Sequence, residues 1–334
     1  MFVPVEPEQT KNNLLCNTNI RILEFLASFL TLDTLAHFRH FRHFRWRGAA
    51  VTLWIMYGLN GLCFGMLLFV LAAGLSLIFG IMHVINLAHG SLYMVGAYFG
   101  VFLAAYTGNF LLAVIGGSVS TAILGMIVHR FLLRRFSGNI LAQVLLTLGL
   151  LFILSDIALW IWGGEPLLID KPAFFNGVIS IGEVSFPIYR LLIMVVGVLI
   201  GGFLWWFQEG TKYGAIIRAG VDDREMVETI GINIPLVMTL VFGLGAILAG
   251  VAGVLGGPMI GAYPGVDFDV LLLSIAVVII GGLGSLRGAL VGALIVGFMD
   301  SIGKGLFPEI SLFILFAVTV AVLAVRPGGL FGRT

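Results

Sequence analysis

Charge is the property that this chain has least of. Asp, Glu, Lys and Arg together make up 10% of its 334 residues, against about 25% in an ordinary soluble domain. None of the four occurs from Gly48 to His129. Such a run is stable only in lipid, because about 20 apolar residues cross a hydrocarbon core once as a helix. We therefore predict an all-α polytopic membrane protein with about 8–10 transmembrane helices, some of them broken.

Several kinds of site are excluded by what is missing. Two cysteines, Cys16 and Cys63, cannot build a disulfide framework or a four-ligand metal site, so no metal is expected. A net charge of +1 without a basic cluster in the body of the chain argues against a nucleic-acid partner. Gly303-Lys304-Gly305 lacks the upstream glycine and the hydroxyl residue of a phosphate-binding loop. We expect no cofactor on this chain, and any ATP must be bound by another.

A membrane-embedded hydrolase is the enzymatic alternative, with His83 or His89 as a base. No serine or cysteine nucleophile with a suitable third partner stands out, and the H-E-x-x-H zinc motif is absent. We assign no catalytic residue and expect the chain not to be an enzyme.

Hydropathy and loop charge predict nine crossings or part-crossings. Their approximate spans are 60–80, 90–106, 111–132, 140–161, 190–208, 234–256, 269–283, 287–303 and 310–325. Basic residues mark the cytoplasmic side, namely Arg130, Arg134, Arg135, Lys212, Arg218, Arg224, Arg326 and Arg333. The segments Gly163 to Pro187, Pro258 to Phe268 and Ser301 to Ile310 are then expected outside.

The N-terminal 48 residues form an extension, interfacial or disordered, ahead of a single transmembrane domain at 49–334. Nine crossings with an inside C-terminus put the residues before Tyr57 outside, whereas the basic His-Phe-Arg repeat at 37–45 favours the inside. Three alternatives would resolve this conflict: one span is a re-entrant hairpin, 20–36 is a further short helix, or the given start lies upstream of the natural one. These alternatives stay open.

A polar island, Ile85-Asn86-Leu87-Ala88-His89-Gly90, interrupts the charge-free run. At membrane depth such a break should face a cavity or the protein interior, because lipid satisfies no polar group. Asn86 and His89, with Tyr93 nearby, are candidates for lining a solute pathway. The ordinary alternative for His89 is an interhelix hydrogen bond. Gly90 is expected to lack a side chain either for space or for unusual backbone angles.

Glycine makes up 45 of the residues, and many are spaced for close helix packing. Small residues fall one turn apart at Gly61 and Gly65, at Gly96 and Gly100, and at Gly284, Gly288 and Gly292. The cluster Gly281-Gly282-Leu283-Gly284-Ser285 differs, and we predict that Gly281, Gly282 and Gly284 make a helix break near the cytoplasmic face.

A charged loop at 209–233 is the only long polar stretch in the second half of the chain. Its pattern predicts two short helices, at Ala215 to Ala219 and at Asp222 to Ile230. Asp222 or Asp223 would cap the second helix, and Gly231 would stop it. Such helices suit the docking of a soluble partner; an ordinary solvated loop is the alternative.

Four motifs in order resemble the permease family of branched-chain amino-acid ABC importers, in particular its H-type subunit, over residues 57–333. They are the island 85–90 with Tyr93-Met94-Val95-Gly96-Ala97-Tyr98, the loop from Arg218-Ala219 to Gly231-Ile232-Asn233, the cluster 281–285, and Arg326-Pro327-Gly328-Gly329-Leu330-Phe331-Gly332. The resemblance leaves the solute open among branched-chain amino acids, urea or short amides, and aromatic acids.

The resemblance also implies partners and a mechanism. A second related permease, two cytoplasmic ATPase subunits and a periplasmic solute-binding protein would join this chain in the lipid of a bacterial inner membrane. Residues 215–230 would be the coupling region, with ATPase contacts at Arg218, Asp222, Arg224 and Glu225. An ion-coupled secondary transporter is the alternative. It is disfavoured because no acidic residue lies near the centre of a predicted span and no inverted repeat is evident.

Overall fold

The computed structural model describes residues 46–83, 85–181, 184–222 and 224–332. Its contacts divide the chain into Met1–Leu53 and Trp54–Thr334. In the first unit only Trp46–Leu53 is described, as the start of a helix. The predictions about the earlier residues therefore lie outside the described part of the chain.

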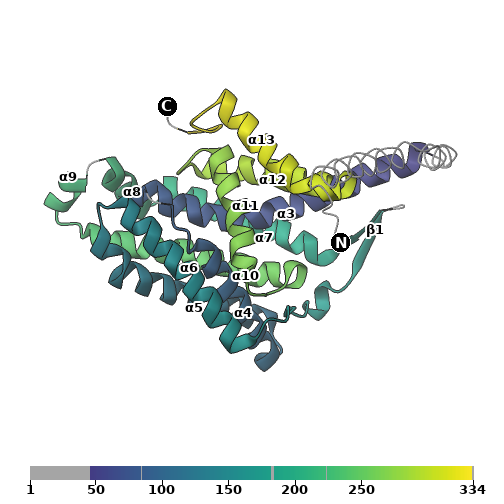
Figure 1. Ribbon diagram of the computed structural model, residues 1–334, viewed down its shortest axis with the longest axis horizontal. Helices are drawn as coiled ribbons and strands as arrows, with labels where there is room; N and C mark the ends of the chain where they lie inside the picture. The colour runs from purple at the N-terminus through teal and green to yellow at the C-terminus, as the bar shows by residue number, and fades with distance from the viewer. Residues whose placement is uncertain (1–45, 84, 182–183, 223, 333–334) are drawn as a thin grey trace, which may run out of the picture. The chain divides into compact units, whose positions relative to one another are not determined.

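The second unit is built almost wholly of helices (Figure 1). They are α3 (Trp46–Met82, which begins in the first unit), α4 (His89–Thr107), α5 (Phe110–Phe131), α6 (Ile140–Trp162), α7 (Ile188–Gly210), α8 (Lys212–Asp222), α9 (Arg224–Thr229), α10 (Ile234–Ile260), α11 (Val266–Gly281), α12 (Leu286–Leu306) and α13 (Ser311–Val325). Short 3-10 turns lie at Leu133–Phe136, Ala173–Phe175 and Pro308–Ile310.

Nine of these helices match the nine predicted spans, and eight are long and apolar enough to cross a membrane. The exception within the described residues is α11, which has 16 residues; α13 reaches the length of a span together with the 3-10 turn Pro308–Ile310. The predicted end of α12 is wrong, because the helix continues through Ser301 to Leu306 instead of ending at 303.

Asparagine and serine start several helices in this uncharged chain. Asn109, Asn139 and Asn233 accept hydrogen bonds from backbone N–H groups in the first turns of α5, α6 and α10, and Ser285 does so for α12. A side-chain cap satisfies an N–H group that has no partner within the helix. Neutral caps achieve this without placing a charge near lipid.

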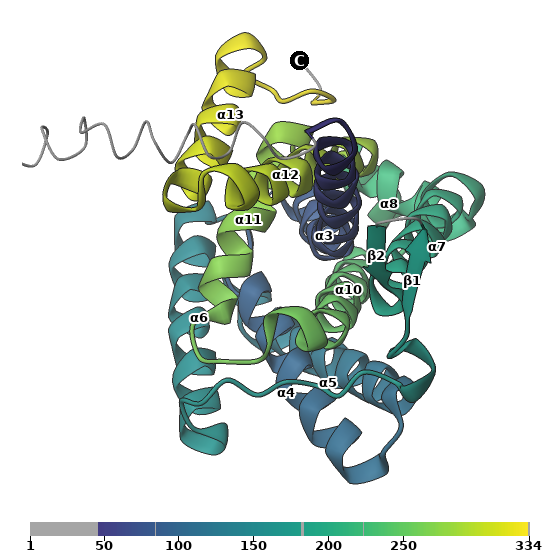
Figure 2. The ribbon, with the colours of Figure 1, turned by 90° about the vertical axis from the view of Figure 1, so that its right-hand side faces the viewer.

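Small residues let the central helices approach closely. A Cβ atom on Gly96 would lie 2.6 Å from the Cα of Gly250, which joins α4 to α10. One on Gly74 would lie 2.7 Å from the carbonyl oxygen of Gly245, which joins α3 to α10. Such distances leave no room for a side chain. Figure 2 looks nearly along α3, with α7, α10, α11 and α12 around it.

The predicted packing roles hold for most of the paired glycines. Gly61 and Gly65 lie against the backbone of α12, and Gly100 lies against Val254 of α10. Gly284 is the exception, because it lies in a turn with φ +78 and not on the face of α12.

The segment expected outside between α6 and α7 carries a two-stranded antiparallel hairpin, β1 (Val178–Ile181) and β2 (Val184–Pro187). Earlier in the same segment, Leu167 N–H donates to the carbonyl oxygen of Ala262 (2.9 Å), and Ala262 N–H donates back (2.7 Å). This bridge joins two segments that the charge pattern places on the same side of the membrane.

Candidate pathway and coupling sites

The first break separates α3 from α4. Helix α3 ends at Met82, and His83 takes a left-handed φ of 54, which stops the helix. The sequence had placed His89 and Gly90 in the break. The next helix begins at His89, so both residues belong instead to the first turn of α4.

Side chains satisfy the backbone within this break. Asn86 Oδ1 accepts from the N–H of Ala88 (3.1 Å), and Thr147 Oγ1 of α6 accepts from the N–H of Leu87 (3.2 Å). The break therefore meets the requirement that lipid imposes on interrupted helices.

The predicted pathway side chains lie in the protein interior in this conformation. Asn86 and Tyr93 are each 1% exposed, and His89 is 0% exposed. His89 Nε2 lies 3.0 Å from the carbonyl oxygen of Leu71 in α3, which makes the interhelix hydrogen bond considered above. Asn86 Nδ2, His89 Nδ1 and Tyr93 Oη have no hydrogen-bond partner among the described residues. Their role toward a solute stays a prediction.

Gly90 lacks a side chain for reasons of space. A Cβ atom there would overlap the carbonyl oxygen of Asp267 in α11. Its φ is not among the positive values, so the alternative of unusual backbone angles is wrong.

Sequence reasoning missed the buried carboxylate of Asp267. It was assigned to an outside loop, yet it lies in the first turn of α11 and is 1% exposed. Ser91 Oγ of α4 donates to its Oδ2 (3.1 Å). The available signal was an acidic residue directly before a short apolar segment.

The second break joins α11 to α12. Gly281 is the last residue of α11, while Gly282 (φ +103) and Gly284 (φ +78) form the turn. The predicted break is thus present, with Gly281 at its edge. A Cβ atom on Gly284 would lie 3.1 Å from the Cα of Gly80, near the end of α3.

The C-terminal tail, residues 326–332, packs against this second break. The N–H groups of Leu330 and Phe331 donate to the carbonyl oxygens of Ile280 and Gly281 (2.9 Å each). Ile280 is 0% exposed, so water cannot readily replace these bonds. A Cβ atom on Gly329 would lie 2.6 Å from Gly282. The tail therefore caps the last turn of α11.

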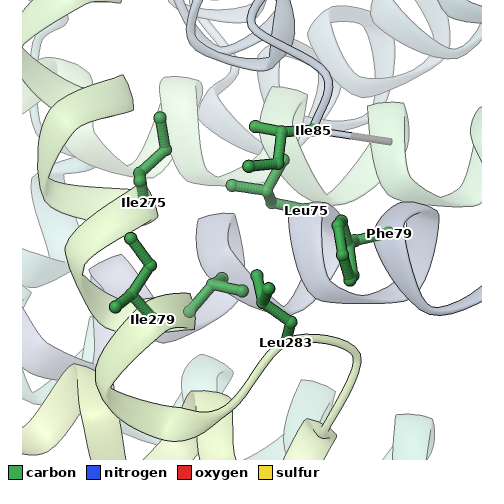
Figure 3. Close-up of a pocket in the computed structure, with 7 residues that line it drawn as sticks. Leu75, Phe79, Ile85, Ile275, Ile279 and Leu283 are labelled. Carbon is green, nitrogen blue, oxygen red and sulfur yellow. The ribbon is translucent and has the colours of Figure 1, made fainter. Parts of the chain in front are cut away.

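An apolar crevice lies between the two breaks (Figure 3). Ile85 enters it from the first break and Leu283 from the second. The lining consists of Leu75, Phe79, Ile85, Ile275, Val278, Ile279 and Leu283. Among the described residues no polar side chain lines it, so the two breaks face each other across apolar surface.

The charged loop folds into two short helices, α8 and α9, as predicted. The predicted bounds of the first were wrong, because α8 runs from Lys212 to Asp222 instead of 215–219. Gly231 has φ +87 and stops the segment after α9. Of the two predicted caps of the second helix, Asp222 is wrong because it is the last residue of α8, and Asp223 lies outside the described residues.

The predicted coupling residues are placed only in part. Arg218 donates to the carbonyl oxygen of Gln208 at the end of α7, and Glu225 is exposed. Asp222 and Arg224 are placed by their backbone, at the end of α8 and the start of α9; their side chains lie outside the described part.

Sequence reasoning also missed Ile217, the buried contact of α8. Its side chain is 8% exposed and packs in one cluster with Leu77 of α3 and Val241 of α10. This cluster gives the charged loop a direct apolar contact with two central membrane helices.

Comparison with known proteins shows the family of this chain. A family described as branched-chain amino acid transport system / permease component matches residues 57–323. The high-affinity branched-chain amino acid transport system permease proteins BraD of Pseudomonas aeruginosa and LivH of Escherichia coli are each 30% identical, covering 82% of this chain and 94% of their own length. The probable permease LivH of Methanocaldococcus jannaschii is 29% identical, over 80% of this chain and 89% of its own.

Among solved structures, PsaBC from Streptococcus pneumoniae in complex with Fab overlaps with a TM-score of 0.44 and 13% identity, over 80% of this chain and 89% of that one. That overlap adds nothing to the assignment.

The family match, together with eight candidate spans among the described residues, identifies this chain as a permease subunit of an ABC importer, a multi-pass protein of the inner membrane. The chain belongs to the family of branched-chain amino acid transport system permease components.

Proposed function

We propose that this chain forms the translocation pathway of an ATP-driven importer for branched-chain amino acids or related small amino acids and amides. The family match over residues 57–323 and the names of the relatives support this solute class. The broken helix pair α3–α4 supports a pathway, because interrupted membrane helices supply polar groups where a solute crosses.

The complete importer would contain a second related permease, two cytoplasmic ATPase subunits and a periplasmic solute-binding protein. This chain contains no phosphate-binding loop. We therefore assign ATP binding and hydrolysis to the ATPase subunits, and neither a cofactor nor a catalytic role to the permease.

The cluster of Ile217, Leu77 and Val241 is the observation that carries the coupling mechanism. A displacement of α8 by an ATPase would press directly on α3 and α10, because packed side chains cannot be compressed. Helix α3 leads into the first break and α10 leads toward Asp267, so both reach the proposed pathway. Closure of the ATPase pair would thereby shift the membrane helices between inward-open and outward-open arrangements.

Asn86, His89, Gly90 and Tyr93 are the proposed pathway residues. Three of them carry buried polar atoms without a described partner, namely Asn86 Nδ2, His89 Nδ1 and Tyr93 Oη. Such atoms are costly in a resting interior and become satisfied when a polar solute or water reaches them. Gly90 allows α4 and α11 to approach closely beside them.

Reconstitution tests the function directly. The chain, its sister permease and the ATPase subunits are placed in liposomes with the loaded solute-binding protein. We expect uptake of leucine, isoleucine or valine that requires ATP. Uptake by the purified chain alone, driven by an ion gradient without nucleotide, would instead establish the secondary-transporter alternative.

A charge reversal tests the coupling helices. Arg224→Glu combined with Glu225→Arg should leave the protein in the membrane but reduce copurification of the ATPase and solute-stimulated ATP turnover, because an interface depends on charge complementarity. Asp170→Arg with Lys171→Glu makes the same reversal in the segment expected outside and should leave copurification unchanged. Unchanged ATP turnover in the first double variant would refute the coupling role.

A further inference from the structure

Helix α11 is shorter than a full membrane crossing. Its 16 residues span about 24 Å at 1.5 Å per residue, which is shorter than the hydrocarbon core of about 30 Å. Its first turn meets the first turn of α4, since Gly90 lies against the carbonyl oxygen of Asp267 and Ser91 Oγ bonds to the Asp267 carboxylate (3.1 Å). Two helix N-termini therefore abut in the protein interior.

Neither of these N-termini has a side-chain cap. The N-cap residues are Ala88 for α4 and Gly265 for α11, and no side-chain cap bond is made at either. By contrast, α5, α6, α10 and α12 each use an Asn or Ser cap, whereas α7 and α13 also lack one. An uncapped N-terminus leaves N–H groups and a partial positive charge, and two adjacent ones repel each other.

The Asp267 carboxylate supplies the missing negative charge. It lies in the first turn of its own helix and is bonded to Ser91 in the first turn of the other. Its residue is 1% exposed, and no ion pair found among the described residues includes it. A carboxylate buried without a cation is costly unless dipoles and hydrogen bonds compensate it, and two helix N-termini do so here.

Asp269 shows that position, and not acidity alone, distinguishes Asp267. It also lies in the first turn of α11, but it is exposed and accepts a hydrogen bond from Tyr263 Oη (2.9 Å). The two carboxylates thus share a helix and differ in whether they join it to α4.

We propose that Asp267 is a positioning residue for transport: its buried carboxylate holds the first turns of α4 and α11 together and so fixes where Asn86, His89 and Tyr93 stand along the solute pathway. The inference rests on the proposed function. It adds a residue that does not need to touch the solute.

The test uses the complete reconstituted importer with Asp267→Asn, Ser91→Ala and, as a matched control, Asp269→Asn. Asparagine keeps the shape of Asp267 and removes its charge. We expect the maximal uptake rate of Asp267→Asn to fall about tenfold, because a buried charge-assisted hydrogen bond is lost. Half-saturation by the loaded binding protein stays unchanged and ATP turnover persists, so less solute moves per ATP. Ser91→Ala should lower the rate by about two- to threefold, since it removes only one donor.

Several results would overturn the inference. One is wild-type uptake by Asp267→Asn; another is an equal loss in Asp269→Asn. A raised half-saturation concentration with an unchanged maximal rate would show that the carboxylate acts on docking of the loaded binding protein instead. Should Asp267→Asn fail to accumulate in the membrane, Ser91→Ala decides: unchanged uptake overturns the proposal. Absence of ATP-dependent uptake by the wild-type complex would overturn the proposed function and this inference with it, whereas the other outcomes leave that function intact.

Discussion

Where α3 gives way to α4, side chains satisfy the interrupted backbone, whereas between α11 and α12 the backbone of the C-terminal tail does so. Asn86 and Thr147 accept the free N–H groups of the first break. At the second, the N–H groups of Leu330 and Phe331 cover the carbonyl oxygens of Ile280 and Gly281. One break thus depends on polar side chains and the other on glycines that let two chain segments touch.

The difference shows how each break can respond to force. Side-chain hydrogen bonds can be exchanged for bonds to a solute while the backbone stays in place. Contacts between glycines at the second break leave no freedom of that kind, because they are set by backbone overlap. We infer that the first break is suited to contact with a solute and the second to holding a helix end fixed.

Gly90→Val should have the largest effect, because it forces apart the helices that meet at the first break. The valine Cβ would overlap the Asp267 carbonyl oxygen, and overpacking of this kind costs about 1–3 kcal/mol or more. We expect more than a tenfold loss of uptake, since each 1.4 kcal/mol is about tenfold. Gly149→Val in α6 is the control, because nothing lies within 4 Å of its Cβ position. Normal uptake by Gly90→Val at a normal membrane level would contradict the close approach.

Gly282→Ala should disrupt the second break, between α11 and α12, and should lower uptake less than Gly90→Val does. Its φ of +103 is unfavourable for alanine, at a cost of about 1–2 kcal/mol, and the new methyl group would collide with Gly332 in the tail. Protease sensitivity of the tail should rise, and uptake should fall several-fold. Gly138→Ala separates strain from collision, because it has φ +91 and open space around it. Equal effects of the two changes would show that the tail contact is unimportant.

His89→Ala sharpens the distinction between stability and transport. Loss of the buried ring and its bond to Leu71 should lower the free energy of unfolding by about 2 kcal/mol. His129→Ala is matched to it, since His129 is 2% exposed and lies 2.9 Å from Thr239 Oγ1, away from the break. We expect similar losses of thermal stability in detergent from both, and reduced uptake per folded molecule from His89→Ala alone. The same uptake in both variants would leave His89 a purely structural group.

Thr147→Val should have the smallest effect. It removes the acceptor for the N–H of Leu87 at the first break, which costs about 1 kcal/mol. Thr319→Val serves as the comparison, because the bond that its hydroxyl makes among the described residues is to Leu315 within its own helix. A thermal melting series in detergent should show a larger decrease for Thr147→Val. If the two decreases are equal, the side-chain support of the break is not significant.

The sequence predicted the class of fold and the order of its helices, because apolar runs of about 20 residues leave few alternatives. It also located both breaks and the charged helix pair, since a polar island or a glycine cluster in such a run has few explanations. It misplaced helix ends such as Leu306 and Lys212, where neighbouring packing decides how far a helix continues. No local pattern revealed the burial of Asp267 or Ile217, because both depend on segments far away in the chain.

The C-terminal motif illustrates the same limit. Its residues carried the family resemblance, yet nothing in Arg326 to Gly332 names α11 as its partner. The glycines were visible, but the surface that they approach is defined only once α11, α12 and the tail are folded together. Contacts between backbones leave the least trace in a single sequence, because they require the absence of side chains.

The bridge between Leu167 and Ala262 has a consequence for signals arriving from the opposite face. A protein could dock on the side of the β1–β2 hairpin and draw Leu167 outward. The two backbone hydrogen bonds to Ala262 would then pull on the segment that leads into α11. Only a few residues separate that point from Asp267. Arrival of cargo outside, through this bridge, and nucleotide events inside, through α10, would then act on the same first turn of α11.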